Sequence, residues 1–183
     1  MTSVPSAVGE LPKHLRPRGA SGAQIEGVAA QVRRLIPFRG EEDPGDFLPP
    51  LVARLGGKIS VVSLASPKEF SGGSLVVLGT GNFAIKLSPL TSPLRDNFTI
   101  AHELGHYILH YPHDDPPGEA VEYHRFGSGS LEREANRFAA ALLMPQELFL
   151  EARKRFDDNV YRIAGHFGVS PNAADVRMKY IVR

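Results

Sequence analysis

With 183 residues, 42% of them hydrophobic, and a formal net charge of +1, the chain is long enough for one well-packed domain and lacks the charge excess typical of nucleic-acid-binding proteins. Cysteine is absent, which excludes disulfides, thiolate metal sites and cysteine nucleophiles, so that any metal ion must be held by His, Asp or Glu. No apolar run approaches the roughly 20 residues that span a bilayer, and a soluble, cytoplasmic protein is expected.

The N-terminal third of the chain predicts a tail followed by two helices. Residues 1–22 are rich in Pro, Gly and Ser and are predicted to form a disordered tail. Apolar residues recur at helical spacing over 24–36, where a first amphipathic helix is expected. A second helix is predicted over 46–55, because it carries prolines in its first turn and glycines directly past its end.

Three compact stretches rich in β-branched residues predict a small sheet. They cover residues 59–64, 75–78 and 83–87. The last two are separated by Thr80-Gly81-Asn82, which resembles a hairpin turn, so these strands are expected to be antiparallel.

The remainder of the chain is predicted to be helical around one polar loop. Ser92 and Pro93 are typical of a helix start, and the long helix that follows is expected to carry residues 98–110. Residues 112–130 are interpreted as a polar loop. Further helices are predicted over 131–144, 145–156, 160–167 and 171–181. Residues 23–145 are thus expected to form one domain, with a C-terminal helical segment over 146–183 packed on it.

Two histidines on the predicted helix over 98–110 form a candidate metal site. Side chains four residues apart lie one above the other on a helix, so the imidazoles of His102 and His106 can bind one tetrahedral ion. Glu103 follows His102 directly, which brings its carboxylate beside the ion, where it can accept a proton from the attacking water and deliver it to the leaving amine. A solvent-exposed helix that carries these residues by chance is the alternative interpretation.

A catalytic site of this kind needs a third protein ligand and an open position for water. Glu132 lies at the start of the helix predicted over 131–144 and can supply that ligand. Glu134 is the competing carboxylate, but on a helix it points about 160° away from Glu132. Glu132 is therefore the preferred third ligand.

The same helix is predicted to hold a supporting residue. Asn136 lies one turn after Glu132, on the same face, and can orient His102 through the ring nitrogen that does not bind the metal. Ala135 lies on the adjoining stripe and is small enough to let this helix approach Gly105 closely.

Other polar residues near the motif allow a structural as well as a functional interpretation. His110 is interpreted as a surface or packing histidine near the helix end rather than an extra ligand or a substrate contact. One of Tyr123, His124 and Arg125, in the predicted loop, can stabilise the oxyanion that forms when water attacks the peptide carbonyl. Simple solvation of the loop is the alternative.

Two stretches of the sequence together resemble the ImmA/IrrE family of metallopeptidases. They are NFTIAHELGH at 97–106 and ExxANxFAAxLLMP at 132–145. Members of that family are zinc endopeptidases of the bacterial cytoplasm that cut a helix-turn-helix repressor after DNA damage or another stress. The resemblance implies Glu103 as the base and the ligands His102, His106 and Glu132.

The resemblance also implies a cofactor, a partner and a fold. The cofactor is Zn²⁺, although a site of this composition accepts Mn²⁺ or another divalent ion, and the partner is a protein substrate, a helix-turn-helix repressor encoded nearby. The fold is α+β, a minimal thermolysin-like core in which a small three-stranded, mostly antiparallel sheet packs on two metal-binding helices, with additional helices at both ends.

In such folds an edge strand beside the active-site helix binds the substrate in extended form. Here that strand is expected to consist of Phe83, Ala84, Ile85, Lys86 and Leu87. An ordinary edge strand, protected from aggregation by Lys86, is the alternative.

The C-terminal stretch 162–177 has the rhythm of a helix-turn-helix motif. Its second helix carries a mixed set of charges rather than a basic face, so direct nucleic-acid binding is not expected, and a structural or substrate-docking role is favoured. The rival to a peptidase is a DNA- or protein-binding regulator, such as a toxin–antitoxin-like partner, in which the metal site is structural or vestigial. Structural zinc sites are closed and commonly rich in cysteine, which favours the enzyme.

Overall fold

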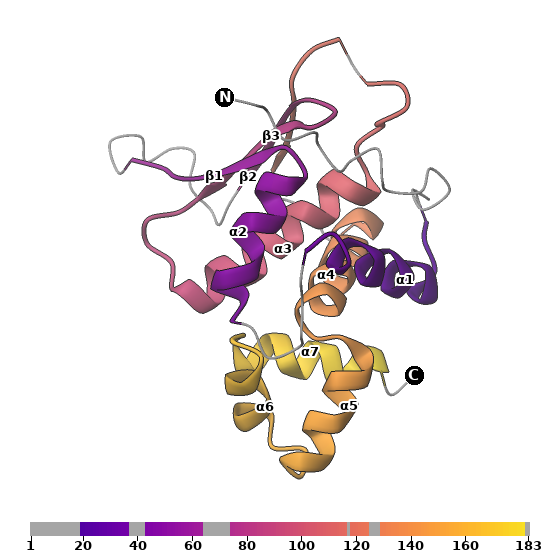
Figure 1. Cartoon of the computed structure of the whole chain (residues 1–183), viewed down its shortest axis with the longest axis vertical. Helices are drawn as coiled ribbons and strands as arrows, with labels where there is room; N and C mark the ends of the chain where they lie inside the picture. Colours follow the sequence, from indigo (N-terminus) through magenta and orange to yellow (C-terminus); the bar gives the residue numbers. More distant parts are fainter. Residues whose placement is uncertain (1–18, 37–42, 64–73, 117, 125–128, 182–183) are drawn as a thin grey trace.

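The computed structural model describes residues 19–36, 43–63, 74–116, 118–124 and 129–181. This part of the chain has an α+β architecture with seven helices and a four-stranded mixed sheet (Figure 1). In chain order the elements are α1 (Gly22–Arg33), α2 (Pro44–Arg54), β1 (Gly57–Val61), β2 (Ser74–Gly79), β3 (Asn82–Leu87), α3 (Pro93–Leu109), β4 (Val121–His124), α4 (Ser130–Leu143), α5 (Gln146–Arg155), α6 (Val160–His166) and α7 (Pro171–Ile181). None of these helices has the length and apolar character that crossing a membrane requires.

The first helix begins slightly earlier than predicted. Ser21 caps it by accepting a hydrogen bond from the backbone amide of Gln24, and the Gln24 side chain accepts one from the Ser21 amide, at 3.3 and 2.8 Å. This capping box fixes the start at Gly22. Of the predicted disordered tail, residues 1–18 lie outside the described part of the chain.

The sheet has the strand order β1-β3-β2-β4. β1 runs parallel to β3, whereas β2 is antiparallel to both β3 and β4. The prediction of three strands is therefore wrong. The fourth strand, β4, lies in the stretch 112–130 that was predicted to be a loop, and it pairs with β2 through partners such as Val121 and Val77.

β3 is an inner strand, which contradicts its prediction as the substrate-binding edge. Both of its sides are hydrogen bonded, one to β1 and the other to β2, so its backbone has no side left for strand addition. Its Phe83, Ile85 and Leu87 side chains are buried in the core. The edges of the described sheet are β1 and β4.

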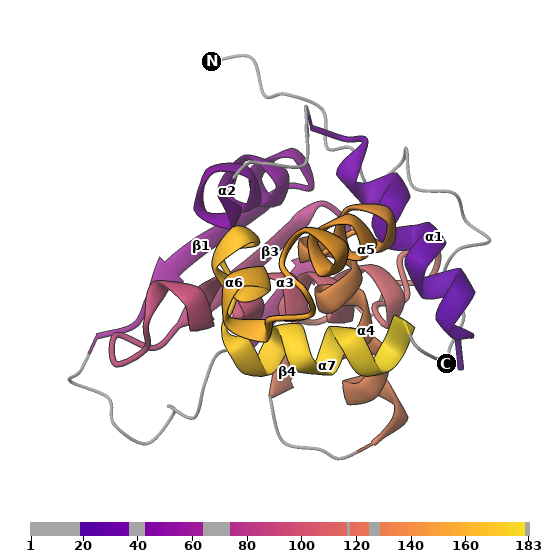
Figure 2. The same cartoon turned by 90° about the horizontal axis from the view of Figure 1, so that it is seen from below.

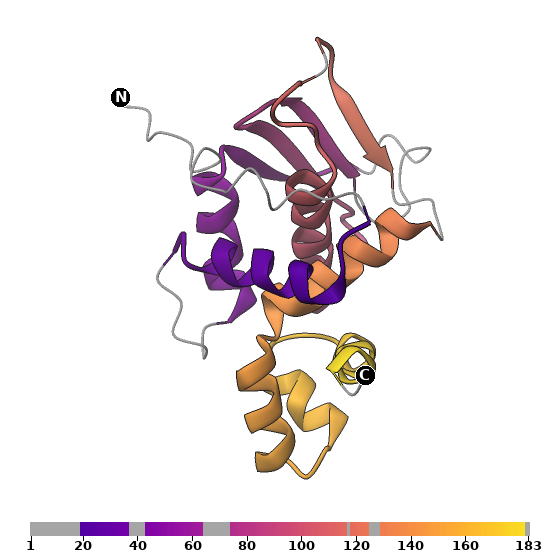
Figure 3. The same ribbon diagram turned by 90° about the vertical axis from the view of Figure 1, so that its right-hand side faces the viewer.

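α3 lies against the sheet and α4 passes beneath α3 (Figure 3). The predicted start at Ser92 and Pro93 is confirmed. The ring of Tyr107 stacks on Phe83 of β3 with a centroid separation of 3.9 Å, and its hydroxyl accepts a hydrogen bond from the Gly81 amide at 2.7 Å. These contacts fix α3 under the β2–β3 hairpin.

The C-terminal helices α5, α6 and α7 form a group below α4 (Figures 1 and 2). Arg177 of α7 is fully buried, donates from Nε to the carbonyl of Met144 at 2.8 Å, and forms an ion pair with Glu26 of α1. On the same side, Arg33 of α1 donates to the carbonyl of Ala141 at 2.5 Å. The buried Arg177 and the half-buried Arg33 thus join α1, α4 and α7, three elements that are distant in sequence.

Candidate metal centre

The His-Glu-x-x-His motif lies in the middle of α3, in the interior of the protein. His102 and Glu103 are each 1% exposed and His106 is 4% exposed. The sheet and α4 cover this helix from opposite sides (Figure 3). The alternative of a solvent-exposed helix is therefore contradicted, since three polar residues are buried together only where they have a role or compensating partners.

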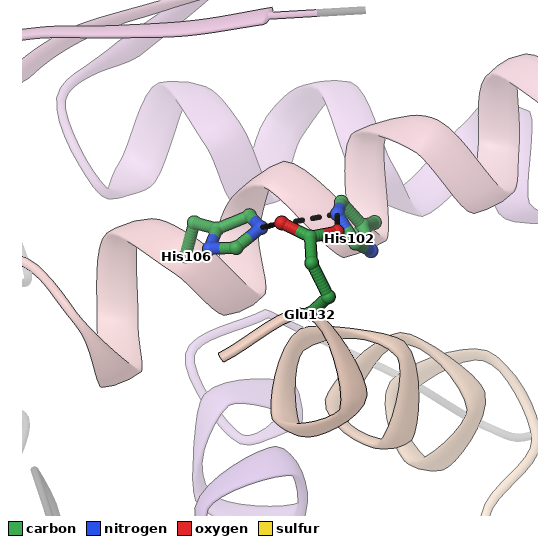
Figure 4. Close-up of side chains that lie close together, drawn as sticks. All are labelled: His102, His106 and Glu132. Atoms are coloured by element: carbon green, nitrogen blue, oxygen red, sulfur yellow. Dashed lines mark hydrogen bonds and ion pairs between the residues drawn. The ribbon is translucent and has the colours of Figure 1, made fainter. Parts of the chain in front are cut away.

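Glu132 of α4 completes a three-residue cluster with the two histidines (Figure 4). Its Oε2 lies 3.3 Å from Nε2 of His102, and its Oε1 lies 3.1 Å from Nε2 of His106. The two Nε2 atoms are 3.1 Å apart. Residues from two different helices thus direct their metal-ligating atoms at one point.

These donor atoms fit a divalent metal ion. Tetrahedral coordination with bonds of about 2.0–2.1 Å separates neighbouring ligand atoms by roughly 3.4 Å. The two Nε2 atoms are 3.1 Å apart, and each has one carboxylate oxygen of Glu132 at a similar distance, Oε2 at 3.3 Å from His102 and Oε1 at 3.1 Å from His106. Within the described residues the cluster consists of two imidazoles and one carboxylate. Three protein ligands are typical of a catalytic centre that keeps one position for water, and this donor set accepts several divalent metals.

A close approach of α3 and α4 brings the ligands together. A Cβ atom at Gly105 would lie 3.0 Å from Cα of Ala135 and 3.2 Å from a side-chain carbon of Phe138. Only glycine fits this position without displacement of α4. The predicted contact of Gly105 with Ala135 is confirmed, and it sets the distance from which Glu132 reaches the histidines.

His102 is oriented by Asn136, as predicted. Nδ1 of His102 lies 3.0 Å from Oδ1 of Asn136, one turn beyond Glu132 on α4. Because Oδ1 of Asn136 can only accept, the neutral ring of His102 carries its hydrogen on Nδ1 and donates it to that oxygen. The bond fixes the tautomer in which Nε2 is free to bind a metal.

The hydrogen-bond partner of His106 is His110, which was not predicted from the sequence. Nδ1 of His106 lies 2.9 Å from Nδ1 of His110, and Nε2 of His110 lies 3.2 Å from Oε2 of Glu134. His110 is 4% exposed, so it is neither a surface residue nor merely a packing residue. The signal that could have revealed it is the repeated spacing of four residues from His102 through His106 to His110.

Of the three residues proposed to stabilise the oxyanion, the structure describes the side chain of one, Tyr123. The ring of Tyr123, in β4, stacks on His106 with a centroid separation of 5.5 Å, so Tyr123 lies beside the metal ligands. His124 is the last residue of β4, and its side chain is not described. Arg125 lies outside the described residues.

A His-Glu-x-x-His helix and a glutamate of the next helix form a three-residue candidate metal centre in an α+β domain. This combination is typical of metallopeptidases. The family model described as the IrrE N-terminal-like domain, a peptidase family, matches residues 75–179, more than half of the chain. The chain belongs to this family, which confirms the resemblance found in its two metal-site helices. The match runs from β2 to α7, with α1, α2 and β1 outside it. A search of curated proteins gave no match.

Proposed function

We propose that this protein is a zinc-dependent endopeptidase of the cytoplasm that makes site-specific cuts in a helix-turn-helix repressor encoded nearby, as part of a stress or mobile-element response. The observation that carries the proposal is the cluster formed by the buried His102 and His106 with the partly buried Glu132, together with the buried Glu103, which follows His102 in α3. Membership of a peptidase family supports the class of reaction. The repressor substrate and the stress context extend that class by analogy with the family.

Glu103 is the residue to which we assign proton transfer. It accepts a proton from the water that attacks the scissile carbonyl, and it delivers that proton to the nitrogen that leaves when the C–N bond breaks. A zinc ion held by the three ligands would polarise the carbonyl and make the attacking water more acidic. His102, His106 and Glu132 hold their positions throughout, and the buried site limits the access of bulk water.

β4 is the strand that we propose to bind the substrate. It is an edge of the described sheet, and its Tyr123 stacks on the ligand His106. A peptide that pairs with the outer side of β4 would therefore pass beside the metal ligands in extended form. Because the ring of Tyr123 stacks on His106, we also propose that its hydroxyl stabilises the oxyanion.

A cavity of about 630 Å³ supports a substrate larger than a single amino acid. Its lining includes Phe98, one turn before His102 on α3, and Asn136, the hydrogen-bond partner of His102. The second helix of the helix-turn-helix-like segment, α7, contributes Val176 and Tyr180 to the same wall. This face of α7 thus lines a cavity beside the site, which favours substrate docking over insertion into a DNA groove.

The substitution Glu103→Gln tests the proposal. The purified protein, loaded with Zn²⁺, is incubated with the helix-turn-helix protein encoded beside its gene, and the products are identified by mass spectrometry. We expect two fragments from the unmodified protein and a rate lower by about 10²–10⁴-fold for Glu103→Gln, with its zinc content retained. Glu147→Gln, at an exposed position of α5, is the matched control and should cut normally. Equal cleavage by Glu103→Gln would contradict the peptidase mechanism.

A further inference from the structure

A buried hydrogen-bonded chain extends from His106 away from the metal ligands. It passes from Nδ1 of His106 to Nδ1 of His110 over 2.9 Å, and from Nε2 of His110 to Oε2 of Glu134 over 3.2 Å. The exposed fraction is 4% for His110 and 7% for Glu134, so solvent competes little for these bonds. His110 is not an additional ligand, because it contacts the ring nitrogen of His106 opposite the one that faces Glu132.

The position of each hydrogen in this chain follows from its two ends. A histidine that binds a metal through Nε2 carries its hydrogen on Nδ1, so His106 donates to His110. Nδ1 of His110 must then be the acceptor, and its own hydrogen lies on Nε2. That hydrogen is donated to Glu134, whose carboxylate can only accept. The carboxylate and the metal site thus select the same pair of tautomers.

The other oxygen of Glu134 is bound by the entry to α1. The backbone amide of Gly19 donates to Oε1 of Glu134 at 3.1 Å. Gly19 has a φ of +82°, a conformation that glycine adopts readily, and it lies two residues before Ser21, the N-cap of α1. The carboxylate is therefore held at both oxygens, on one side by His110 and on the other by a segment outside the family match.

We propose that His110 and Glu134 are positioning residues of the metal centre, which fix the tautomer and orientation of His106 and increase its basicity as a ligand. This inference rests on the metal site of the proposed function. An outer partner of this kind contributes to metal affinity although it never touches the metal. The N-terminal segment that holds Glu134 is, on this proposal, a functional addition to the family domain.

His113 offers a matched comparison, because it is also buried and hydrogen bonded but does not belong to the series of hydrogen bonds from His106 to Glu134. It is 8% exposed, and its Nε2 lies 2.7 Å from the backbone carbonyl of Tyr107. Loss of His113 should weaken the fold locally and leave zinc binding unchanged. Loss of His110 should weaken zinc binding itself.

The first experiment determines the tautomers in the unmodified protein. Long-range ¹H–¹⁵N correlation spectra of the zinc-loaded protein distinguish protonated from unprotonated ring nitrogens. We expect the hydrogen on Nδ1 of His106 and on Nε2 of His110. A hydrogen on Nδ1 of His110 would overturn the proposal, because that nitrogen could then not accept from His106. This measurement needs no substitution, so it does not depend on whether a variant folds.

The second experiment measures zinc affinity by competition with a chromophoric chelator. We expect His110→Leu to lower the affinity by about 10–100-fold, and Glu134→Gln, which keeps an acceptor but loses the charge, to lower it by about tenfold. His110→Gln, which can still accept from His106, should recover most of the loss. Unchanged affinity in His110→Leu, or an equal loss in His113→Leu, would overturn the proposal.

These measurements use no peptide, so they separate the inference from the proposed function. If zinc affinity depends on His110 and Glu134 but the protein cuts no repressor, the proposed function alone is contradicted. A protein that cuts its substrate normally with His110→Leu at saturating zinc, and shows unchanged zinc affinity, would contradict the positioning role alone.

Discussion

The two histidine ligands lie on successive turns of the same helix, yet they are supported in different ways. His102 donates to a neutral amide, Asn136, in a single step. His106 is supported through two steps, by His110 and then by the carboxylate of Glu134. The first arrangement is confined to α3 and α4, whereas the second reaches the segment before α1 through the amide of Gly19.

This difference shows how much of the centre depends on α4. Within two turns that helix supplies the metal ligand Glu132, the carboxylate Glu134 and the amide Asn136. Glu132 and Asn136 share one face, and Glu134 points to another, where it meets the end of α3. The position of α4 against α3 therefore determines the ligand geometry and both outer supports at once.

Removing the ligand that the two imidazoles share should have the largest effect. We expect Glu132→Ala to lower zinc affinity by more than the roughly 100-fold that an outer-shell substitution costs at most, because a direct ligand is lost. The measurement is the chelator competition, together with metal content by mass spectrometry. Glu147→Ala serves as the control, and a loss smaller than that of His110→Leu would show that Glu132 is not a ligand.

Moving α4 away from α3 should weaken the hydrogen bonds that support His102 and His106 at the same time. In Gly105→Ala the new methyl group would lie 3.0 Å from Cα of Ala135, so α4 must shift. Such overpacking costs roughly 1–3 kcal/mol, which exceeds the ~1 kcal/mol that alanine gains over glycine within a helix. We expect a lower free energy of unfolding in urea and zinc affinity reduced by about 10–100-fold.

Gly27→Ala is the matched control for that substitution. Gly27 lies in the interior of α1, and a Cβ atom there would meet nothing within 4 Å. We expect it to raise the free energy of unfolding by roughly 0.5–1 kcal/mol and to leave zinc affinity unchanged. If Gly105→Ala behaved in the same way, the close approach of the helices would not matter for the site.

The hydrogen bond between His102 and Asn136 can be given a charged acceptor, like the carboxylate that ends the support of His106. Asn136→Ala removes the acceptor and should lower zinc affinity by about tenfold. Asn136→Asp supplies a charged acceptor, and since charge-assisted hydrogen bonds are roughly twice as strong, the affinity should be kept or increased. Asn172→Ala, at the wall of the same cavity, is the control. Equal losses in Asn136→Ala and Asn136→Asp would show that packing, not the hydrogen bond, orients His102.

The sequence predicts the parts of the site that depend on position within one helix. The spacing of His102 and His106, and the shared face of Glu132 and Asn136, follow from helical geometry alone. The partner of His106 does not follow from it. Helical geometry places Glu134 away from Glu132, but only the packing of α4 on α3 shows that this direction leads to His110.

The errors in the sheet have the same origin. β4 is four residues long and stands alone in a polar stretch, so it is a strand only because it pairs with the distant β2. β3 was expected at an edge because the family resemblance implies an edge strand beside the active-site helix. Its parallel pairing with β1 joins strands that no short turn connects, and local patterns do not predict such a partner.

The smallest effect is expected at the sheet edge, where Tyr123 stacks on His106 with a centroid separation of 5.5 Å. Aromatic pairs contribute about 0.5–1.5 kcal/mol, so Tyr123→Ala should lower zinc affinity by roughly threefold. That is less than the loss in His110→Leu, because the ring restrains His106 by contact without fixing its tautomer. Tyr161→Ala, at a residue that is 74% exposed, is the control. A greater loss in Tyr123→Ala than in His110→Leu would mean that β4, rather than α4, positions this ligand.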